Sequence, residues 1–207
     1  MYRDDLELLR STRRRTLSMV ARLSQPQFDF SPECGRWSVG EALDHLLLSE
    51  EIFRGQIAEL IELDKACRPP VIKRSLSQLD FSIGFIPKSI LALAAGPFTL
   101  FNMLVPAQAR FFLIRNRLLP AQTATASMPR KARPANTMTE QLRTSLRETE
   151  ALFEENSKLD FSRMFSEHPL LGTNNVVELL RLIALHEQRH QEQISEVIKG
   201  KQFPRAA

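Results

Sequence analysis

The sequence has little of the residue types that interrupt helices, and this scarcity indicates its fold class. Its 207 residues include 7 glycines and 12 prolines, whereas leucine, arginine, glutamate and alanine are abundant. No segment alternates apolar and polar residues for long enough to predict a sheet. The hydrophobic share of 43% and the charged share of 25% are ordinary for a globular protein with one buried core. We therefore expect an all-α protein that forms a single domain over residues 1–207.

Cysteine is also scarce, which argues against a disulfide-stabilised scaffold. The two cysteines, Cys34 and Cys67, form neither a C-x-x-C motif nor a framework of pairs. A reducing compartment is the simpler setting for such a chain. The first ten residues, MYRDDLELLR, carry charges where a secretory signal needs its apolar region. The sequence therefore predicts a cytoplasmic protein.

Acidic residues are nearly missing from the middle of the chain. Residues 65–135 hold 11 Lys and Arg but only one acidic residue, Asp80. Residues 1–64 hold 8 basic and 12 acidic residues, and residues 136–207 hold 9 and 11. The net charge of +4 therefore comes from one internal segment. Because no nucleic-acid-binding module accompanies these charges, we expect no nucleic-acid partner.

Four segments show the apolar spacing of amphipathic helices, and they cover about 3–24, 38–63, 138–157 and 175–199. Three of them open with a capping box, in which a side-chain oxygen and a Glu three residues later bind free backbone N–H groups. The boxes are Ser38 with Glu41, Thr137 with Glu140, and Asn175 with Glu178. In the first segment, we expect most of the arginines to lie on the solvent-exposed face, namely Arg10, Arg13, Arg14 and Arg15. Such helices pack most simply as a four-helix bundle, with about 65–135 inserted between the second and third helices.

The insertion contains a long uncharged run, SILALAAGPFTLFNMLVPAQA, over residues 89–109. Its length matches the roughly 20 residues that span a bilayer. However, Gly96, Pro97 and Pro106 interrupt the run, and Asn102 would be costly in lipid. Three interpretations stay open, namely short helices buried against the bundle, contact with a membrane surface, and a transmembrane helix. The interruptions favour the first.

The stretch HEQRH, from His186 to His190, matches the H-E-x-x-H motif of zinc proteases. The two histidines lie one turn apart on the apolar face of the fourth helix. There they are either core histidines with hydrogen bonds or ligands of a metal ion. A zinc protease needs a third ligand downstream, but most residues after His190 complete the same helix. A ferritin-like di-iron site needs a second Glu-x-x-His, and Glu41 and His45 are one residue too far apart.

A third candidate ligand lies upstream, on the second helix. His45 lies at the margin of the apolar stripe of that helix. One histidine from one helix and an i, i+4 pair from another make a set of three nitrogens. Such a set leaves coordination positions open, as in catalytic metal sites. The only tryptophan, Trp37, is expected to pack at the start of the same helix.

The segments GRWSVGEALDHLLLSE and SEHPLLGTNNVVELLRLIALHEQRHQEQI resemble the DinB-like superfamily of metalloenzymes. The shared elements are Trp-Ser followed by Glu and His-Leu, then His-Pro-x-x-Gly, then His-x-x-x-His followed by Gln-Ile. They cover about half of the chain. The resemblance implies an up-and-down four-helix bundle, a homodimer, and a divalent ion, usually nickel or zinc, held by three histidines. The matching residues here are His45, His186 and His190. Relatives include thiol transferases that use bacillithiol or mycothiol, and a maleylpyruvate isomerase.

Four further residues are candidates for the surroundings of the site. Gln193, one turn beyond His190, could orient a ligand or hold a histidine tautomer, or it could be a core amide bound to backbone. Glu41 is expected as the helix cap rather than as a base. Glu187 could flank the site or pair with an arginine. His168 could overhang the site mouth or be a solvated loop histidine.

Two functions from different classes follow from these patterns. The first is a metal-dependent enzyme, a transferase or hydrolase that acts on a small molecule, with a low-molecular-weight thiol as cosubstrate. In this hypothesis the insertion covers the open metal positions. The alternative is a non-catalytic helical protein that docks to a membrane surface or a partner through residues 83–119.

Overall fold

The computed structural model describes residues 2–74, 125–168 and 172–205. The described chain is mostly helical, which confirms the prediction of an all-α class. The insertion is described only at its two ends. The uncharged run at 89–109 lies outside the described residues, as does the whole docking segment at 83–119, so the three interpretations of the run stay predictions.

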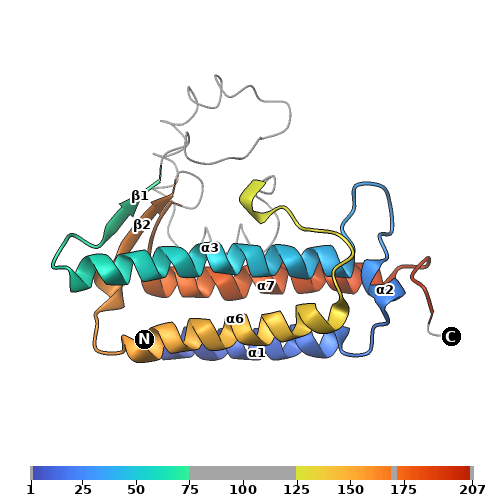
Figure 1. Cartoon of the computed structure of the whole chain (residues 1–207), viewed down its shortest axis with the longest axis horizontal. Coiled ribbons are helices and arrows are strands. Elements are labelled where there is room, and N and C mark those ends of the chain that lie inside the picture. The colour runs from blue at the N-terminus through green and yellow to red at the C-terminus, as the bar shows by residue number, and fades with distance from the viewer. Residues whose placement is uncertain (1, 75–124, 169–171, 206–207) are drawn as a thin grey trace, which may run out of the picture.

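Four long helices lie side by side along the length of the molecule (Figure 1). They are α1 (Tyr2–Val20), α3 (Val39–Lys65), α6 (Ala135–Glu155) and α7 (Val176–Lys199). Helices α1 and α3 each contact both α6 and α7, so the four enclose a common interior. Figure 1 shows α1 and α7 running one way and α3 and α6 the other. The order is therefore up, down, down, up, because residues 66–134 bring the chain back to the end where α3 begins. This order differs from the up-and-down order that the resemblance implied.

Two of the three predicted capping boxes start their helices. The Ser38 hydroxyl accepts from the Glu41 backbone N–H while the Glu41 carboxylate accepts from the Ser38 N–H, and Asn175 and Glu178 do the same for α7. The prediction that Thr137 and Glu140 cap the third long helix is wrong. Helix α6 begins at Ala135, directly after Pro134, whose ring fixes a backbone angle suited to a helix start.

The first helix is shorter than predicted. It ends at Val20, and a five-residue helix, α2 (Gln25–Asp29), follows it. The side chains of Ser24 and Gln27 cap α2, and Pro26 lies in its first turn. The apolar spacing continues across this break, so the pattern alone predicted one helix to residue 24.

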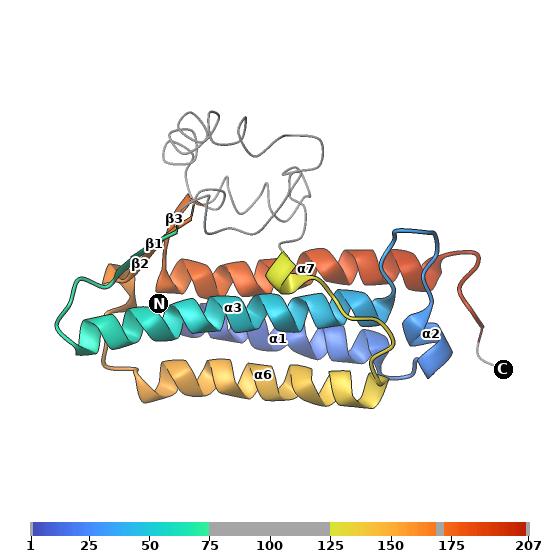
Figure 2. The same cartoon turned by 45° about the horizontal axis from the view of Figure 1, so that its top comes forward.

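A small sheet contradicts the expectation that the chain has no strands. Strands β1 (Val71–Lys73), β2 (Phe165–His168) and β3 (Gly172–Asn175) form it in that order. Strand β1 pairs parallel to β2, and β2 pairs antiparallel to β3. With three or four residues each, the strands are too short for a recognisable alternation. Figure 2 shows the sheet at the end of the bundle where α7 begins.

The apolar core has two parts, one toward each end of the bundle. One cluster includes Leu9, Ile57, Phe153 and Ala184, and the other includes Val20, Leu46, Leu142 and Ile194. On each long helix, the sequence between the two clusters carries a buried polar residue: Arg13, Glu50, Thr149 and Glu187. The interior of the protein is therefore apolar, then ionic, then apolar along its length.

Arg13 is the centre of this ionic layer. The prediction that Arg13 lies on the solvent-exposed face of its helix is wrong, because its side chain is 1% exposed. It donates to Glu50 at 2.6 Å and to both carboxylate oxygens of Glu187 at 3.0 and 3.1 Å, and it also binds the Leu142 carbonyl. Thr149 donates to the second oxygen of Glu50 at 2.9 Å. One network thus joins all four long helices.

The pKa of Arg13 shows which effect dominates in this network. Burial opposes the charge of the guanidinium, but the carboxylates of Glu187 and Glu50 outweigh burial and raise its pKa. Burial also raises the pKa of Glu187, while Arg13 acts in the opposite direction. The guanidinium therefore stays charged, and each carboxylate depends on it as a partner.

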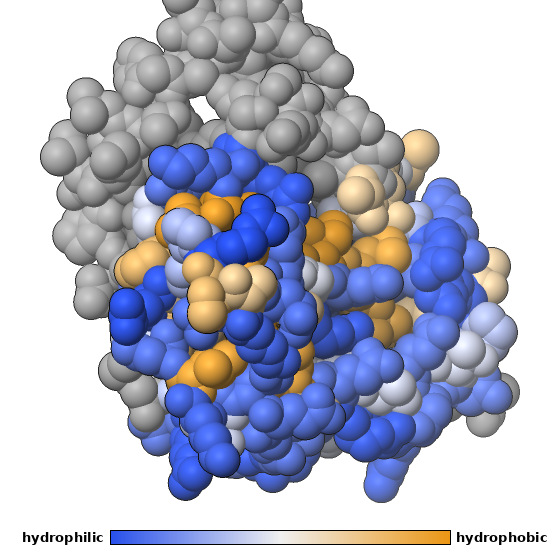
Figure 3. Space-filling model, turned by 60° about the vertical axis from the view of Figure 1, so that its left-hand side comes forward, coloured by the Kyte–Doolittle hydropathy of each residue, from blue (hydrophilic) through white to orange (hydrophobic). Residues whose placement is uncertain are grey.

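Hydrophilic side chains surround smaller hydrophobic patches on the face at the sheet end (Figure 3). Among the described residues, the large hydrophobic side chains that are exposed are Ile52, Val71 and Met128. No helix within residues 2–74, 125–168 and 172–205 is long and apolar enough to cross a bilayer.

Replacing Arg13 by Met should destabilise the protein strongly, because it leaves two buried carboxylates without their cation. Losing one partner of a buried ion pair costs about 3–5 kcal/mol. Urea unfolding at neutral pH measures this change in the free energy of unfolding. The matched control is Arg10→Met on the same helix, where the half-exposed pair with Glu150 contributes about 1 kcal/mol or less. Equal losses in the two variants would show that the buried network carries no special stability.

Candidate metal centre

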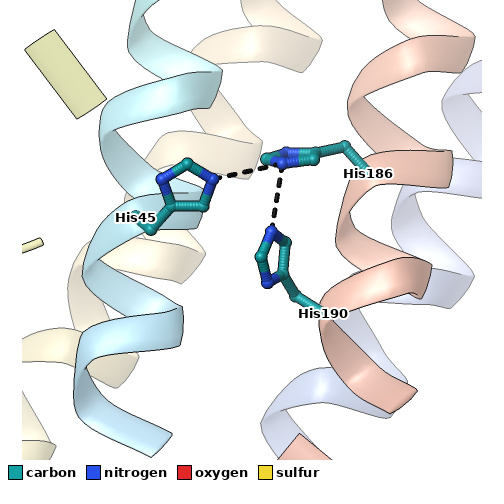
Figure 4. Close-up of side chains that lie close together, drawn as sticks. All are labelled: His45, His186 and His190. Atoms are coloured by element: carbon teal, nitrogen blue, oxygen red, sulfur yellow. Dashed lines mark hydrogen bonds between the residues drawn. The ribbon is translucent and has the colours of Figure 1, made fainter. Parts of the chain in front are cut away.

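Three histidine side chains from two helices meet between α3 and α7 (Figure 4). His45 comes from α3, while His186 and His190 lie one turn apart on α7. His186 Nε2 is 3.2 Å from His45 Nε2 and 3.1 Å from His190 Nε2. The donor nitrogens of the group all lie within 4.8 Å of one another. The structure thus brings together the three histidines that the sequence selected.

The outer nitrogens of two rings have their own acceptors. His45 Nδ1 lies 2.8 Å from the Ser127 carbonyl oxygen, and His190 Nδ1 lies 2.9 Å from Gln193 Oε1. An oxygen of either kind accepts a hydrogen bond, so each Nδ1 carries the proton and donates. In the neutral rings the Nε2 atoms of His45 and His190 are consequently lone-pair donors, and both face His186.

The surroundings disfavour the charged forms of His45 and His186. Burial lowers the pKa of His186 well below its ordinary value, and the charges of His190, His45 and Arg189 act in the same direction. Burial also lowers the pKa of His45, although its bond to Ser127 opposes the shift. A second or third proton is therefore disfavoured in the cluster.

A divalent ion fits this donor set. A proton on His186 Nε2 can point fully at only one of its two neighbours, His45 Nε2 or His190 Nε2. In the other short contact, two nitrogen atoms then face each other without a hydrogen bond between them. Nitrogens at about 2.0–2.1 Å from one ion lie roughly 2.9 Å apart at right angles and roughly 3.3 Å apart at the tetrahedral angle. The two separations from His186 Nε2, 3.2 Å to His45 Nε2 and 3.1 Å to His190 Nε2, lie between these values. Neutral imidazole nitrogen is a ligand that suits zinc and nickel.

An ion cluster holds the acceptor of His45 in place. Asp44 is fully buried and accepts from Arg130 at 2.8, 2.9 and 3.1 Å, and it also binds Arg133. Burial would raise the pKa of Asp44, but these hydrogen bonds outweigh it and lower the pKa. The bonds fasten the segment from the short helix η2 (Thr125–Ser127) to Arg133 against α3. The carbonyl of Ser127 is thereby held over His45.

The only tryptophan lies against the histidines. The Trp37 ring centroid is 4.8 Å from that of His45 and 5.9 Å from that of His190, onto which it stacks at 18°. The sequence predicted that Trp37 packs at the start of the helix, but it gave no sign of the contact with the site. Ser38 caps α3 directly after Trp37, so the cap fixes where the indole lies.

The other candidate residues have distinct roles. Gln193 holds the His190 ring, as one of its two interpretations predicted. Glu41 is part of the cap of α3. Glu187 is 1% exposed and paired with Arg13, so it does not face the histidines as a base. His168 is not a loop residue, since it lies in β2, half-buried and paired with Gly172.

Sequence reasoning missed two contributors to the site, Asp44 and Ser127. Neither belongs to a motif, because their contacts join positions more than 80 apart in the chain. The only signals were the basic charge of residues 65–135 and the expectation that this insertion covers the metal positions. Neither indicated the buried Asp44, which Arg130 and Arg133 bind.

The stability of the protein should fall as the pH drops from about 6.5 to about 4, because of His168. Burial, followed by the charge of Arg74, lowers the pKa of His168 to about 4. In that interval the unfolded chain binds a proton that the folded chain does not, so acid favours unfolding. The effect has an upper bound of about 3 kcal/mol, from 1.36 kcal/mol for each pKa unit.

Urea unfolding of the parent and of His168→Gln at about pH 7 and about pH 5 measures this contribution. The variant should lose less stability between the two pH values than the parent does. Parallel losses would mean that His168 titrates normally.

The sequence comparisons agree with this geometry. The family model of the DinB superfamily matches residues 8–194, which include all four long helices wholly or in large part. Searches of curated proteins and of solved structures gave no significant match. With a match over most of its length and three histidines gathered on α3 and α7, the chain belongs to the DinB superfamily.

Proposed function

We propose that this protein binds one divalent ion, nickel or zinc, through His45, His186 and His190, and that it is a metal-dependent transferase or hydrolase. The observation that carries the proposal is the convergence of the Nε2 atoms of the three rings. Two of these rings have their Nδ1 protons fixed by other acceptors. Such an arrangement has little use in a purely structural core, where each imidazole needs one donor and one acceptor partner.

Three neutral ligands leave the charge of the ion uncompensated and part of its coordination sphere open. When bound, such an ion acts as a Lewis acid and lowers the pKa of a thiol or water. The protein contributes the orientation of the rings: Ser127 and Gln193 fix two of them from outside. Trp37 covers one side of the histidines with an apolar surface and limits the approach of water there.

The substrate that we propose is a small molecule, with a low-molecular-weight thiol as cosubstrate. Thiol transferases are among the members of the superfamily that the chain resembles, which supports this choice. The electrostatics also support it, because Arg189 places a positive charge close enough to lower the pKa of both His45 and His186. A thiolate is an anion and is favoured by that charge and by the ion.

Several broader features belong to the same proposal. We propose that the four long helices form the DinB-type four-helix bundle and that the protein is a homodimer in solution. The free, exposed Cys34 and Cys67 support a reducing compartment such as the cytoplasm.

The proposal separates this site from a peptidase site with the same H-E-x-x-H spacing. In a peptidase the Glu of the motif acts as a base beside the ion. Here Glu187 binds Arg13 through both carboxylate oxygens. Within the described residues, the metal-binding group contains only histidines and no carboxylate.

Metal analysis of protein purified without a histidine tag tests the proposal. The parent should hold about one equivalent of nickel or zinc after dialysis, and His45→Ala or His186→Ala should hold well below half of that. Removing one of three ligands lowers affinity because the remaining two cannot supply the third donor nitrogen. The matched control is His168→Ala, since His168 is the one other histidine of the chain, and it should keep the metal of the parent.

An unchanged metal content in His45→Ala would contradict the proposed site. Circular dichroism of each variant shows whether the fold is intact, so a loss of metal through unfolding is recognised separately.

A further inference from the structure

Among the residues that the structure describes, Ser49 is the one whose hydroxyl lies within hydrogen-bond distance of an inner nitrogen of the histidine cluster. It lies one helical turn after His45, so both side chains occupy the same face of α3. Its Oγ is 3.4 Å from His45 Nε2, the same nitrogen that lies 3.2 Å from His186 Nε2. The hydroxyl is therefore on the inner side of the His45 ring, opposite the Nδ1 atom that binds Ser127.

The orientation of Ser49 differs from that of an ordinary buried hydroxyl in a helix. Such a hydroxyl commonly donates to the carbonyl four residues earlier. Thr16 on α1 is buried and does so, to the Thr12 carbonyl at 3.3 Å. Among the described contacts, Ser49 has only His45 Nε2 as a hydrogen-bond partner. The Ser49 hydroxyl is thus directed at the site and not at its own helix.

An ion held by the histidines would take this partner away from Ser49. The lone pair of His45 Nε2 would bind the ion and could no longer accept a hydrogen bond. Ser49 is 7% exposed, so bulk water does not readily replace the lost acceptor. A buried hydroxyl without a partner is unfavourable, so Ser49 then needs another acceptor. The two candidates are the His45 carbonyl one turn earlier and whatever occupies the open side of the ion, and the observed direction of Oγ toward the inner nitrogens favours the second.

We infer that Ser49 is a positioning residue for the exchangeable ligand of the metal site, to which its hydroxyl donates a hydrogen bond. This inference rests on the proposed function. The ligand class is an anion that accepts a hydrogen bond, such as a thiolate. Ser49 contributes orientation and affinity for that ligand but does not itself hold the ion.

Two substitutions test this placement with the cobalt-loaded protein, whose visible spectrum reports changes at the ion. Ser49→Ala removes the donor. The affinity for the metal should stay within about threefold, whereas the affinity for the probe 2-mercaptoethanol should fall roughly 3- to 10-fold, the effect of losing one hydrogen bond. The spectral titration with 2-mercaptoethanol gives this affinity directly, without an activity assay.

Ser49→Cys tests the geometry. If the Ser49 side chain points at the open side of the ion, the new thiolate should bind cobalt, add a thiolate-to-cobalt charge-transfer band and raise the affinity for the metal. The matched control is Ser145→Cys, a buried serine of α6 that hydrogen-bonds Arg54 and should add no band. Circular dichroism establishes that each variant has the parent fold.

The outcomes separate the inference from the proposed function. If the parent binds cobalt, but Ser49→Cys adds no band and Ser49→Ala leaves the 2-mercaptoethanol affinity unchanged, the role of Ser49 is overturned while the metal site stands. If the parent binds neither cobalt nor nickel nor zinc, the proposed function itself is overturned, and the role of Ser49 falls with it.

Discussion

The buried contact between Arg13 and the carboxylates of Glu50 and Glu187 is the constraint on which the rest of the structure depends. It joins α1 to both helices that carry the histidines, and Thr149 extends it to α6. A charged layer between two apolar clusters is unfavourable unless every partner is present, so it fixes how the four helices align along their length. The same contact explains why a motif of peptidase spacing lacks a free base.

In His45 and His190, the Nδ1 atom faces away from the cluster and the Nε2 atom faces into it. The outer side of His45 depends on a segment that follows the long insertion, and Asp44 holds this segment through Arg130 and Arg133. The outer side of His190 depends on Gln193 of its own helix. Because two outer nitrogens are bound in this way, the inner nitrogens keep the orientation in which a single ion can bind them. The site therefore depends on two ionic contacts of α3, the buried one between Glu50 and Arg13 and the one between the buried Asp44 and the more exposed Arg130 and Arg133.

The sequence predicted the parts of this structure that depend on local patterns. Capping boxes located the starts of α3 and α7, and helical periodicity placed His186 and His190 on one face. The choice of His45 needed the expectation that the two helices are neighbours in a bundle. These inferences succeeded because each needed at most one assumption about packing.

The parts that the sequence could not predict depend on contacts between distant residues. Arg13 lies among other arginines, and nothing local distinguishes it from its exposed neighbours. Its burial follows from two carboxylates that approach it from α3 and α7. The strands of the small sheet were also missed, because their pairing and not their composition makes them strands. Trp37 was placed correctly along the chain, but its contact with His45 depends on the path of the loop before α3.

The central claim is that one ion binds at the point where the three Nε2 atoms meet. Anomalous diffraction from a crystal grown with zinc or nickel tests it most directly. The account predicts one strong peak about 2.0–2.1 Å from the Nε2 atoms of His45, His186 and His190. A crystal that contains the metal elsewhere, with no peak between these three rings, would contradict it.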